Sequence, residues 1–278
     1  MTPIVVCTLA LLALPAAAAD IPSILARKVL RKASVSVAVA DARTGEWLLS
    51  RAADEPRIPA SNLKLITSAA ALDALGPEHH FVTRLLAREA PLDGVLAGDL
   101  VVVGAGDPSL RGDALDYLGV GDPAAHLAGM LADAGLQRID GAVVLDDGLF
   151  DRQWVHPDWE RDDLEHDYAA PVSALSIHGN CLTLVADGRH GGERPRVRLV
   201  PAIDGYSVSN RLRWGPSKSK PSVRVGRPDD GGRLTVLGEV PRGVGPMAPI
   251  QVPVHDAPLF FGRALVDALD GVGIEVRR

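Results

Sequence analysis

The stretch Pro59-Ala60-Ser61-Asn62-Leu63-Lys64 opens the segment that decides the fold. Proline has a fixed φ and no N–H, so it suits the approach to a helix start, where the first backbone donors have no partner. Apolar residues then recur at roughly helical spacing as far as Leu75, and Gly76-Pro77 supplies the ending. We therefore predict a buried helix, apolar on most faces, that runs to about Leu75.

Ser61 and Lys64 stand three residues apart, so a helix places both side chains on one face of its first turn. A hydroxyl beside an amine is a candidate pair of nucleophile and base. An exposed lysine is a poor base at neutral pH, but burial and the positive end of the helix dipole favour its neutral form. The spacing alone also fits an ordinary buried helix start. Ser217 and Lys220 repeat it in a stretch that is typical of an exposed basic loop.

The first nineteen residues are typical of a secretory signal. An apolar run from Ile4 to Leu14, too short to cross a bilayer, is followed by Pro15 and an alanine tract. Cleavage after Ala19 would satisfy the preference for small residues. We expect a periplasmic or extracellular protein, and no later segment is long and apolar enough to predict a transmembrane anchor.

Composition narrows the class of protein. The 278 residues carry 29 Lys and Arg against 35 Asp and Glu, a formal net charge of −6, with few aromatic residues. This balance argues against nucleic acid as the main partner. Without the signal, Cys181 is the single cysteine, so no internal disulfide is expected and packing has to hold the fold together. No pattern predicts a cofactor.

Local signals predict short strands between turns, with a few helices. A hairpin is expected from the alternation in 34–40, the turn Asp41–Gly45 and a return strand at 46–49. Helices should start at Asp122-Pro123 and at Asp256-Ala257-Pro258. Further strands are expected at Leu100–Val103, Ala142–Leu145, Cys181–Ala186, Val197–Val200, Ser222–Val225 and Leu234–Val240.

Two other sequence features could indicate a binding site, but an ordinary turn or loop explains each of them better. Gly104-Ala105-Gly106 follows a strand, but Ser109 stands at the third glycine position of a dinucleotide-binding motif, so a turn is the better interpretation. The acidic run from Asp158 to Asp167 lacks a calcium-loop pattern and is more typical of a solvated loop than of a metal site. No Gly-x-Ser-x-Gly elbow is present.

Several segments, in chain order, carry a family resemblance: Asp41–Leu48, Ile58–Ala70, Leu75–Pro77, Phe81–Thr83, Gly104–Leu110, Leu145–Phe150, Tyr168–Ser176 and Asn180. Together they resemble the class C low-molecular-mass penicillin-binding proteins, which are D-alanyl-D-alanine carboxypeptidases and endopeptidases. Ile58–Ala70 is similar to the region around the nucleophile, and Gly104–Leu110 to the family's Gly-x-Gly-Asp-Pro-x-Leu.

The resemblance implies an α+β fold, a serine DD-peptidase domain of the β-lactamase/transpeptidase type with a β-rich inserted domain. By resemblance, residues 20–82 begin the peptidase domain, 83–250 form the insert and 251–278 start the return. Ser61 would be the acylating nucleophile and Lys64 its proton partner. Asp146 fits an acidic residue of the insert that meets the substrate. Peptidoglycan stem peptides would be the substrate, and β-lactams covalent inhibitors.

The sequence departs from the family in its last part. The family's Ser-x-Asn and Lys-Thr/Ser-Gly motifs do not occur, and no lysine follows Lys220. We therefore expect a truncated or incomplete peptidase with little activity, whose apolar helix around Ser61 would be left exposed. Two alternatives stay open. One is a non-catalytic protein that binds peptidoglycan or a partner, and the other is a secreted serine hydrolase acting on other amides or esters.

Overall fold

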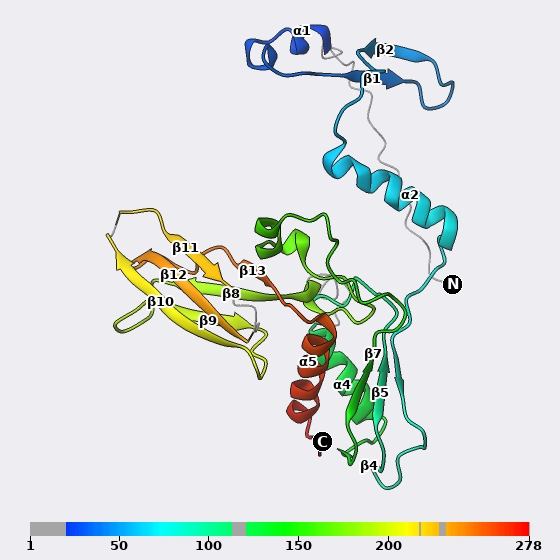
Figure 1. Cartoon of the computed structure of the whole chain (residues 1–278), viewed down its shortest axis with the longest axis vertical. Helices are drawn as coiled ribbons and strands as arrows, with labels where there is room; N and C mark the ends of the chain where they lie inside the picture. Colours follow the sequence, from blue (N-terminus) through cyan, green and yellow to red (C-terminus); the bar gives the residue numbers. More distant parts are fainter. Residues whose placement is uncertain (1–20, 113–120, 217, 228–231, 278) are drawn as a thin grey trace. The chain divides into compact units, whose positions relative to one another are not determined.

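The structure is a computed structural model that describes residues 21–112, 121–216, 218–227 and 232–277. Helices alternate with several small sheets that contain both antiparallel and parallel strand pairs, so the fold is α+β, as predicted (Figure 1). The chain divides into two units, Met1–His79 and His80–Arg278. The expected signal segment, 1–19, lies outside the described residues.

The first unit holds one hairpin and several short helices. Strands β1 (Val37–Ala40) and β2 (Trp47–Arg51) pair antiparallel, and Asp41 closes the turn by accepting hydrogen bonds from the N–H groups of Arg43 and Thr44, both at 2.8 Å. The predicted hairpin is thus confirmed. The helical elements are α1 (Ile21–Leu25), the 3₁₀ helices η1 (Lys28–Leu30) and η2 (Ala60–Asn62), and α2 (Leu63–Leu75).

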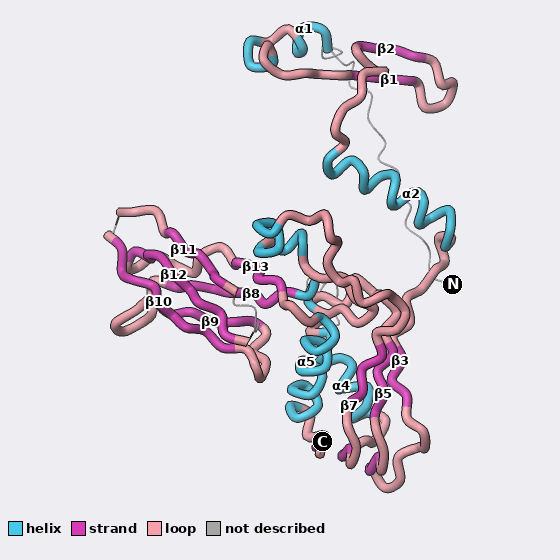
Figure 2. Tube along the Cα trace, in the orientation of Figure 1, coloured by secondary structure: helices cyan, strands magenta, loops and turns pink. Residues whose placement is uncertain are grey.

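The second unit contains a three-stranded sheet of order β3-β5-β7, with β3 at Arg84–Leu86, β5 at Leu100–Val103 and β7 at Val143–Asp146 (Figure 2). Helices α4 (Pro123–Asp133) and α5 (Ala257–Gly271) pack on each other, and α5 also packs on β7. Gly262 permits this approach, because a Cβ there would lie 2.7 Å from Leu145 Cδ1.

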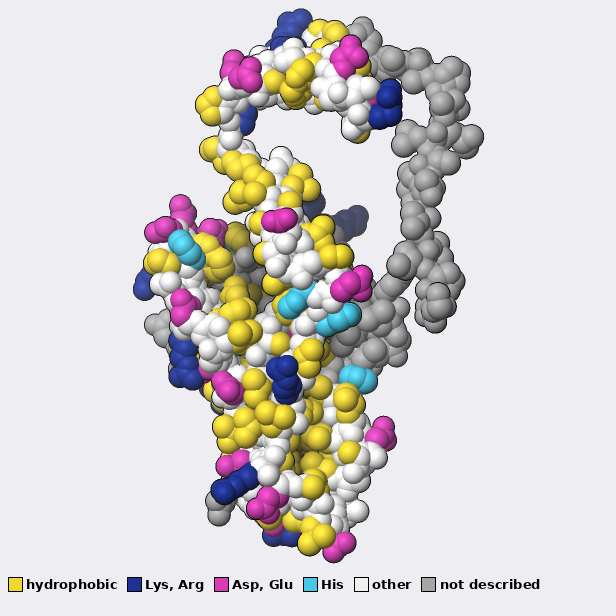
Figure 3. All heavy atoms as spheres, turned by 90° about the vertical axis from the view of Figure 1, so that its right-hand side faces the viewer, with side chains coloured by type: hydrophobic (Ala, Val, Ile, Leu, Met, Phe, Trp, Pro, Cys, Tyr) yellow, Lys and Arg dark blue, Asp and Glu magenta, His cyan; other side chains and the backbone are white. Residues whose placement is uncertain are grey.

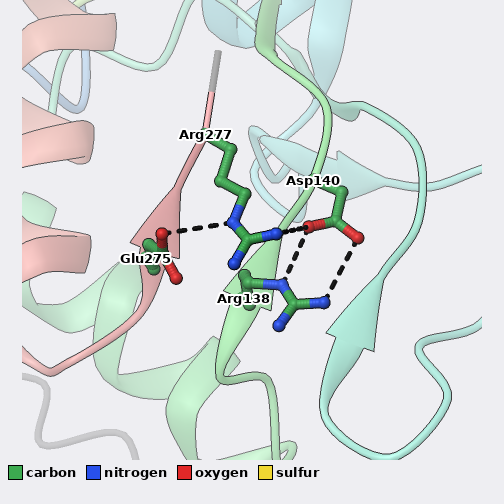
Figure 4. A network of polar contacts seen from close by, with 4 residues as sticks. All are labelled: Arg138, Asp140, Glu275 and Arg277. Atoms are coloured by element: carbon green, nitrogen blue, oxygen red, sulfur yellow. Dashed lines mark hydrogen bonds and ion pairs between the residues drawn. The ribbon is translucent and has the colours of Figure 1, made fainter.

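A second, smaller sheet consists of two-residue strands in the order β14-β6-β4: β4 (Val95–Leu96), β6 (Arg138–Ile139) and β14 (Glu275–Val276). Ion pairs fix its edge (Figure 4). Arg138 Nε and Arg277 Nη1 lie 2.8 and 3.3 Å from the same oxygen of Asp140, and Arg277 Nε lies 3.2 Å from Glu275. The guanidinium groups of this region are therefore neutralised by carboxylates.

The remaining strands form two sheets, ordered β13-β8-β9 and β10-β12-β11. Their bounds are β8 (Cys181–Asp187), β9 (Arg196–Val200), β10 (Ser207–Gly215), β11 (Ser222–Gly226), β12 (Arg233–Pro241) and β13 (Ile250–Pro253). Both sheets contribute apolar side chains to one buried cluster, for example Leu184 and Leu212, each fully buried. Between α4 and β8 the chain also forms the 3₁₀ helices η3 (Arg161–Glu165), η4 (Asp167–Ala169) and η5 (His178–Asn180).

Several sequence expectations need comment. The helices at 123 and 257 and the six predicted strands are present, within two residues at their ends. Strand β10 was not predicted, nor were the short β3, β4, β6 and β13, whereas β14 lies in the segment 274–276 that was expected to be extended. In the part expected to start the return into the peptidase domain, 251–278, β13 pairs with β8 and α5 packs on α4; the domain assignment itself stays a prediction. Both elements belong to the second unit.

Candidate active site

Local backbone geometry sets the start of α2. Pro59 has φ −71°, and Ala60 follows in the left-handed region with φ 46°, which is uncommon for a residue with a Cβ. Such a conformation costs about 1–2 kcal/mol. The chain then makes the single turn η2 and continues into α2, so Ser61 lies in the turn that leads into the helix. The predicted helix is confirmed, and Gly76, with φ 80°, ends it.

The structure brings Ser61 and Lys64 together. Lys64 Nζ donates to Ser61 Oγ over 3.2 Å, as the i, i+3 spacing predicts. A hydroxyl and an amine at this distance can exchange a proton directly, which is the requirement for a serine nucleophile activated by lysine. The second Ser-x-x-Lys is not comparable: Lys220 is exposed in a loop, and Ser217 lies outside the described residues.

The expected burial of this helix end is wrong, whereas the exposure of the apolar helix, which the sequence also predicts, is confirmed. Ser61 and Lys64 are exposed, and no described residue between 21 and 79 is buried. The apolar side chains of α2 encircle the helix, so it needs apolar partners on several sides. The elements described between 21 and 79 are a two-stranded hairpin and short helices, which are too small to provide them. Figure 3 shows hydrophobic side chains at the surface of α2.

Asp146, the third predicted site residue, ends β7 in the second unit. Its Oδ1 accepts a hydrogen bond from the N–H of Gly148 at 3.0 Å, and its backbone carbonyl accepts one from Gly104 at 2.9 Å. The first bond closes the turn after the strand, a structural role that aspartate commonly has, and the second continues the parallel pairing of β5 with β7. A contact between Asp146 and a substrate stays a prediction.

The other constellations have structural explanations. Gly104 and Gly106 allow close packing on the loop that contains Ala174: a Cβ on Gly104 would lie 2.4 Å from Ala174 O, and the N–H of Gly106 donates to that oxygen at 2.8 Å. Among the described residues, no group of three His, Cys, Asp or Glu side chains has the arrangement of a metal site. None of the described helices has the length and apolarity needed to span a membrane.

Comparison with known proteins identifies the family. A profile of the D-Ala-D-Ala carboxypeptidase 3 (S13) family matches residues 17–278. The chain belongs to this family. It is 32% identical over 269 residues to a D-alanyl-D-alanine carboxypeptidase of Actinomadura sp. (strain R39), an alignment that covers 93% of this chain and 47% of that protein.

Two further comparisons, one of sequence and one of structure, agree with this assignment. The D-alanyl-D-alanine carboxypeptidase DacB of Haemophilus influenzae is 27% identical over 221 residues, or 78% of this chain and 44% of DacB. The crystal structure of penicillin-binding protein 4 (dacB) from the same organism shares the fold, with a TM-score of 0.68 over 87% of this chain and 53% of that one, at 23% identity. The chain thus spans about half the length of these relatives.

Sequence reasoning missed one group of polar residues. Arg211 and Arg213 point outward from β10, while Val208 and Leu212 point inward. The alternation of polar and apolar residues from Arg211 to Arg213 is a signal in the sequence that could have indicated this strand. This arginine-bearing face lies outside the predicted site residues.

Proposed function

We propose that this chain is an exported serine-type D-Ala-D-Ala carboxypeptidase or endopeptidase that acts on peptidoglycan stem peptides in the periplasm or outside the cell. The observation that supports it best is the 3.2 Å contact between Lys64 Nζ and Ser61 Oγ at the start of α2, in a chain of the S13 family. Two relatives of the chain bear the name D-alanyl-D-alanine carboxypeptidase.

The proposed reaction is a split acyl transfer. Ser61 Oγ attacks the carbonyl carbon of the scissile amide while Lys64, in its neutral form, takes the hydroxyl proton. The C–N bond then breaks, and the leaving amine receives that proton from Lys64. Water hydrolyses the resulting ester with Lys64 as the base. The backbone N–H of Ser61 is suited to stabilise the oxyanion, because it belongs to the turn that opens the helix. Asp146 would meet a polar group of the peptide.

We further propose that this polypeptide reacts slowly. The family's Ser-x-Asn and Lys-Thr/Ser-Gly motifs do not occur in these 278 residues, and the loss of one oxyanion donor typically lowers a rate by about 10²–10³. The exposed Ser61–Lys64 pair also lacks the water-excluded environment in which electrostatic stabilisation is strong.

Labelling with a fluorescent penicillin tests the proposal, because a β-lactam would acylate the same hydroxyl. We expect weak labelling, at least about a hundredfold slower than that of the Haemophilus relative. The label should be located at Ser61 by mass spectrometry and be lost in Ser61→Ala and in Lys64→Ala. The matched control is Lys220→Ala, which alters the other Ser-x-x-Lys and should leave labelling unchanged.

Three results would contradict parts of this proposal. Labelling as fast as in the relative would overturn the slow reaction, and labelling that survives Ser61→Ala would overturn the nucleophile. Absence of any label at saturating penicillin would overturn catalysis and favour the alternative, a protein that binds peptidoglycan or a partner without chemistry. The exposure of the Ser61–Lys64 pair is the observation in favour of that alternative.

A further inference from the structure

The positive charge of the chain is concentrated in one part of the second unit. Residues 187–242 hold twelve Lys and Arg against six Asp and Glu, a formal charge of +6 in a chain whose total is −6. This segment contains β9 to β12. A basic region on an acidic protein indicates a surface that attracts anions rather than a general adaptation for solubility.

The strand register directs the arginines to one face of the sheet β10-β12-β11. Arg211 and Arg213 alternate with the buried Leu212, so both point outward. Their partners across the strand pair, Leu237 and Glu239, are exposed on the same face. Arginines two residues apart on a strand are separated by roughly 6.6 Å. The face thus presents two guanidinium groups side by side.

These side chains line a hollow of about 520 Å³, together with Arg194 and Gly238. Arg194 Nη1 donates to the carbonyl of Leu212 at 3.2 Å, which fixes its guanidinium beside β10. Gly238 lets β11 approach closely, because a Cβ there would overlap Ser222 O. A concave surface with several convergent polar groups is the usual form of a binding site.

Arg211 and Arg213 have no ion pair with any residue that the structure describes. Glu239 is the register partner of Arg213 but does not bind it. Arg138 and Arg277 behave differently, since both bind Asp140 (Figure 4). The guanidinium groups on the β10 face therefore keep their full capacity to bind a carboxylate in bidentate fashion.

We propose that this hollow is a second peptidoglycan site, which binds the carboxylate-bearing stem peptides and holds the chain on the wall; it rests on the proposed substrate. Stem peptides carry more carboxylates than amines and have alanine methyl groups. The three arginines match the carboxylates, Glu239 matches a free amine, and the 46% exposed Leu237 matches the methyl groups. A polyphosphate or nucleic acid offers no partner for Glu239 or Leu237.

Sedimentation with purified peptidoglycan sacculi tests this inference in the full chain. All variants carry Ser61→Ala, so that binding is measured without turnover. Arg211→Gln with Arg213→Gln should weaken binding at low salt roughly tenfold, because two charge-assisted contacts are lost. The matched control is Arg196→Gln with Arg198→Gln, two exposed arginines at the same spacing on β9 in the other sheet, which should bind like the parent.

Chemical treatment of the sacculi identifies the group that is bound. Amidation of the carboxylates with carbodiimide should abolish the difference between parent and Arg211/Arg213 variant, whereas removal of wall phosphates with hydrofluoric acid should preserve it. Equal losses in the two arginine pairs would show that only net charge matters and would overturn the site. So would a difference that disappears with the phosphates.

The same experiment separates this inference from the proposed function. Penicillin labelling of the chain with Ser61 intact measures catalysis and should be unaffected by Arg211→Gln and Arg213→Gln. If binding to sacculi depends on these arginines but no label is taken up, the wall site is supported and the proposed peptidase activity is wrong. If Ser61 is labelled but sacculi are bound equally well with and without the two arginines, the peptidase activity is supported and the wall site is wrong.

Discussion

Helices α2 and α5 are similar in length and in apolar content, yet their environments are opposite. In α5, Asp256 caps the first turn and eight residues are buried, with Phe260 and Leu265 fully so. In α2 no residue is buried, and Leu65 and Ile66 are 73% and 66% exposed. In α5 the apolar residues lie on the sides that meet α4, β7 and β14. In α2 they encircle the helix.

The difference shows what an apolar helix needs from its surroundings. Most of the stability of a helix in a protein comes from tertiary packing and little from intrinsic propensity. The second unit supplies that packing to α5, and the described part of the first unit does not supply it to α2. The apolar surface of α2 is therefore the larger liability for association.

The sharpest test of this comparison makes the same truncation in both helices. Leu265→Ala removes a fully buried side chain and should lower the free energy of unfolding by about 2–5 kcal/mol, the usual cost of the lost transfer energy and the cavity. Leu65→Ala removes an exposed one and should change it by no more than about 0.5 kcal/mol. Urea unfolding of the full chain, followed by circular dichroism, measures both.

The two leucine variants control each other, because they share chemistry and differ in burial. Equal costs would show that α2 is packed in solution, and the comparison would fail. A negligible cost for Leu265→Ala would show that the core around α5 is loosely packed.

A second test uses the thiol of Cys181, which is 4% exposed at the start of β8. Burial raises its pKa to about 12, so at pH 8 it stays protonated in the folded chain. Since the thiolate is the reactive form, alkylation by iodoacetamide should be at least about a hundredfold slower than in urea and should wait for opening of the second unit. A Cys7→Ser background leaves Cys181 as the single thiol.

The alkylation rate of Cys181 also distinguishes the packing of α5 from that of α2. Leu265→Ala should speed the alkylation of Cys181, because it destabilises the unit that contains the thiol, while Leu65→Ala should not. Reaction of the parent protein as fast as a free thiol would mean that the second unit opens easily and that its burial is not maintained in solution.

The parts of the fold that could be predicted from the sequence depend on neighbouring residues. Pro59 and Gly76 bound α2, Asp41–Gly45 closes the hairpin, and Asp122 and Asp256 cap their helices by accepting from the N–H groups three residues on. The missed strands depend on distant pairing. β10 lies parallel to β12, and the two-residue strands β4 and β6 pair with each other across more than forty residues of sequence.

In the candidate site, too, the features set by neighbouring residues could be predicted and those set by distant ones could not. The Ser61–Lys64 contact follows from i, i+3 geometry on one helix, so the sequence was sufficient for it. Burial of that pair required partners for α2, which local patterns do not reveal. The hollow at Arg211 and Arg213 was missed because its residues come from strands whose register is set by tertiary pairing.

The smallest expected effect concerns Asp122, which joins α4 to the turn at His178. Its Oδ1 accepts from the N–H of Ala125 at 2.9 Å, and its Oδ2 lies 3.3 Å from His178 Nε2. The pKa of the Asp122 carboxyl lies below its usual range, mainly because of the His178 imidazole. Burial opposes this shift, and the N–H of Ala125 adds a smaller lowering effect. Loss of such a cap costs about 1 kcal/mol.

Because the folded-state pKa of Asp122 is the lower one, the carboxylate stabilises the fold above its unfolded-state pKa, and this contribution is lost as the pH falls through the folded-state value. Asp122→Ala should therefore cost about 1 kcal/mol at pH 7 and progressively less below pH ~4, measured as urea unfolding with Cys181 alkylation reporting on the second unit. The control, Asp41→Ala, removes the exposed carboxyl of the first unit's hairpin turn and should leave that readout unchanged. If the cost of Asp122→Ala stays constant from pH 7 to pH 3, the cap stabilises the second unit without its negative charge, and the expected pH dependence is wrong.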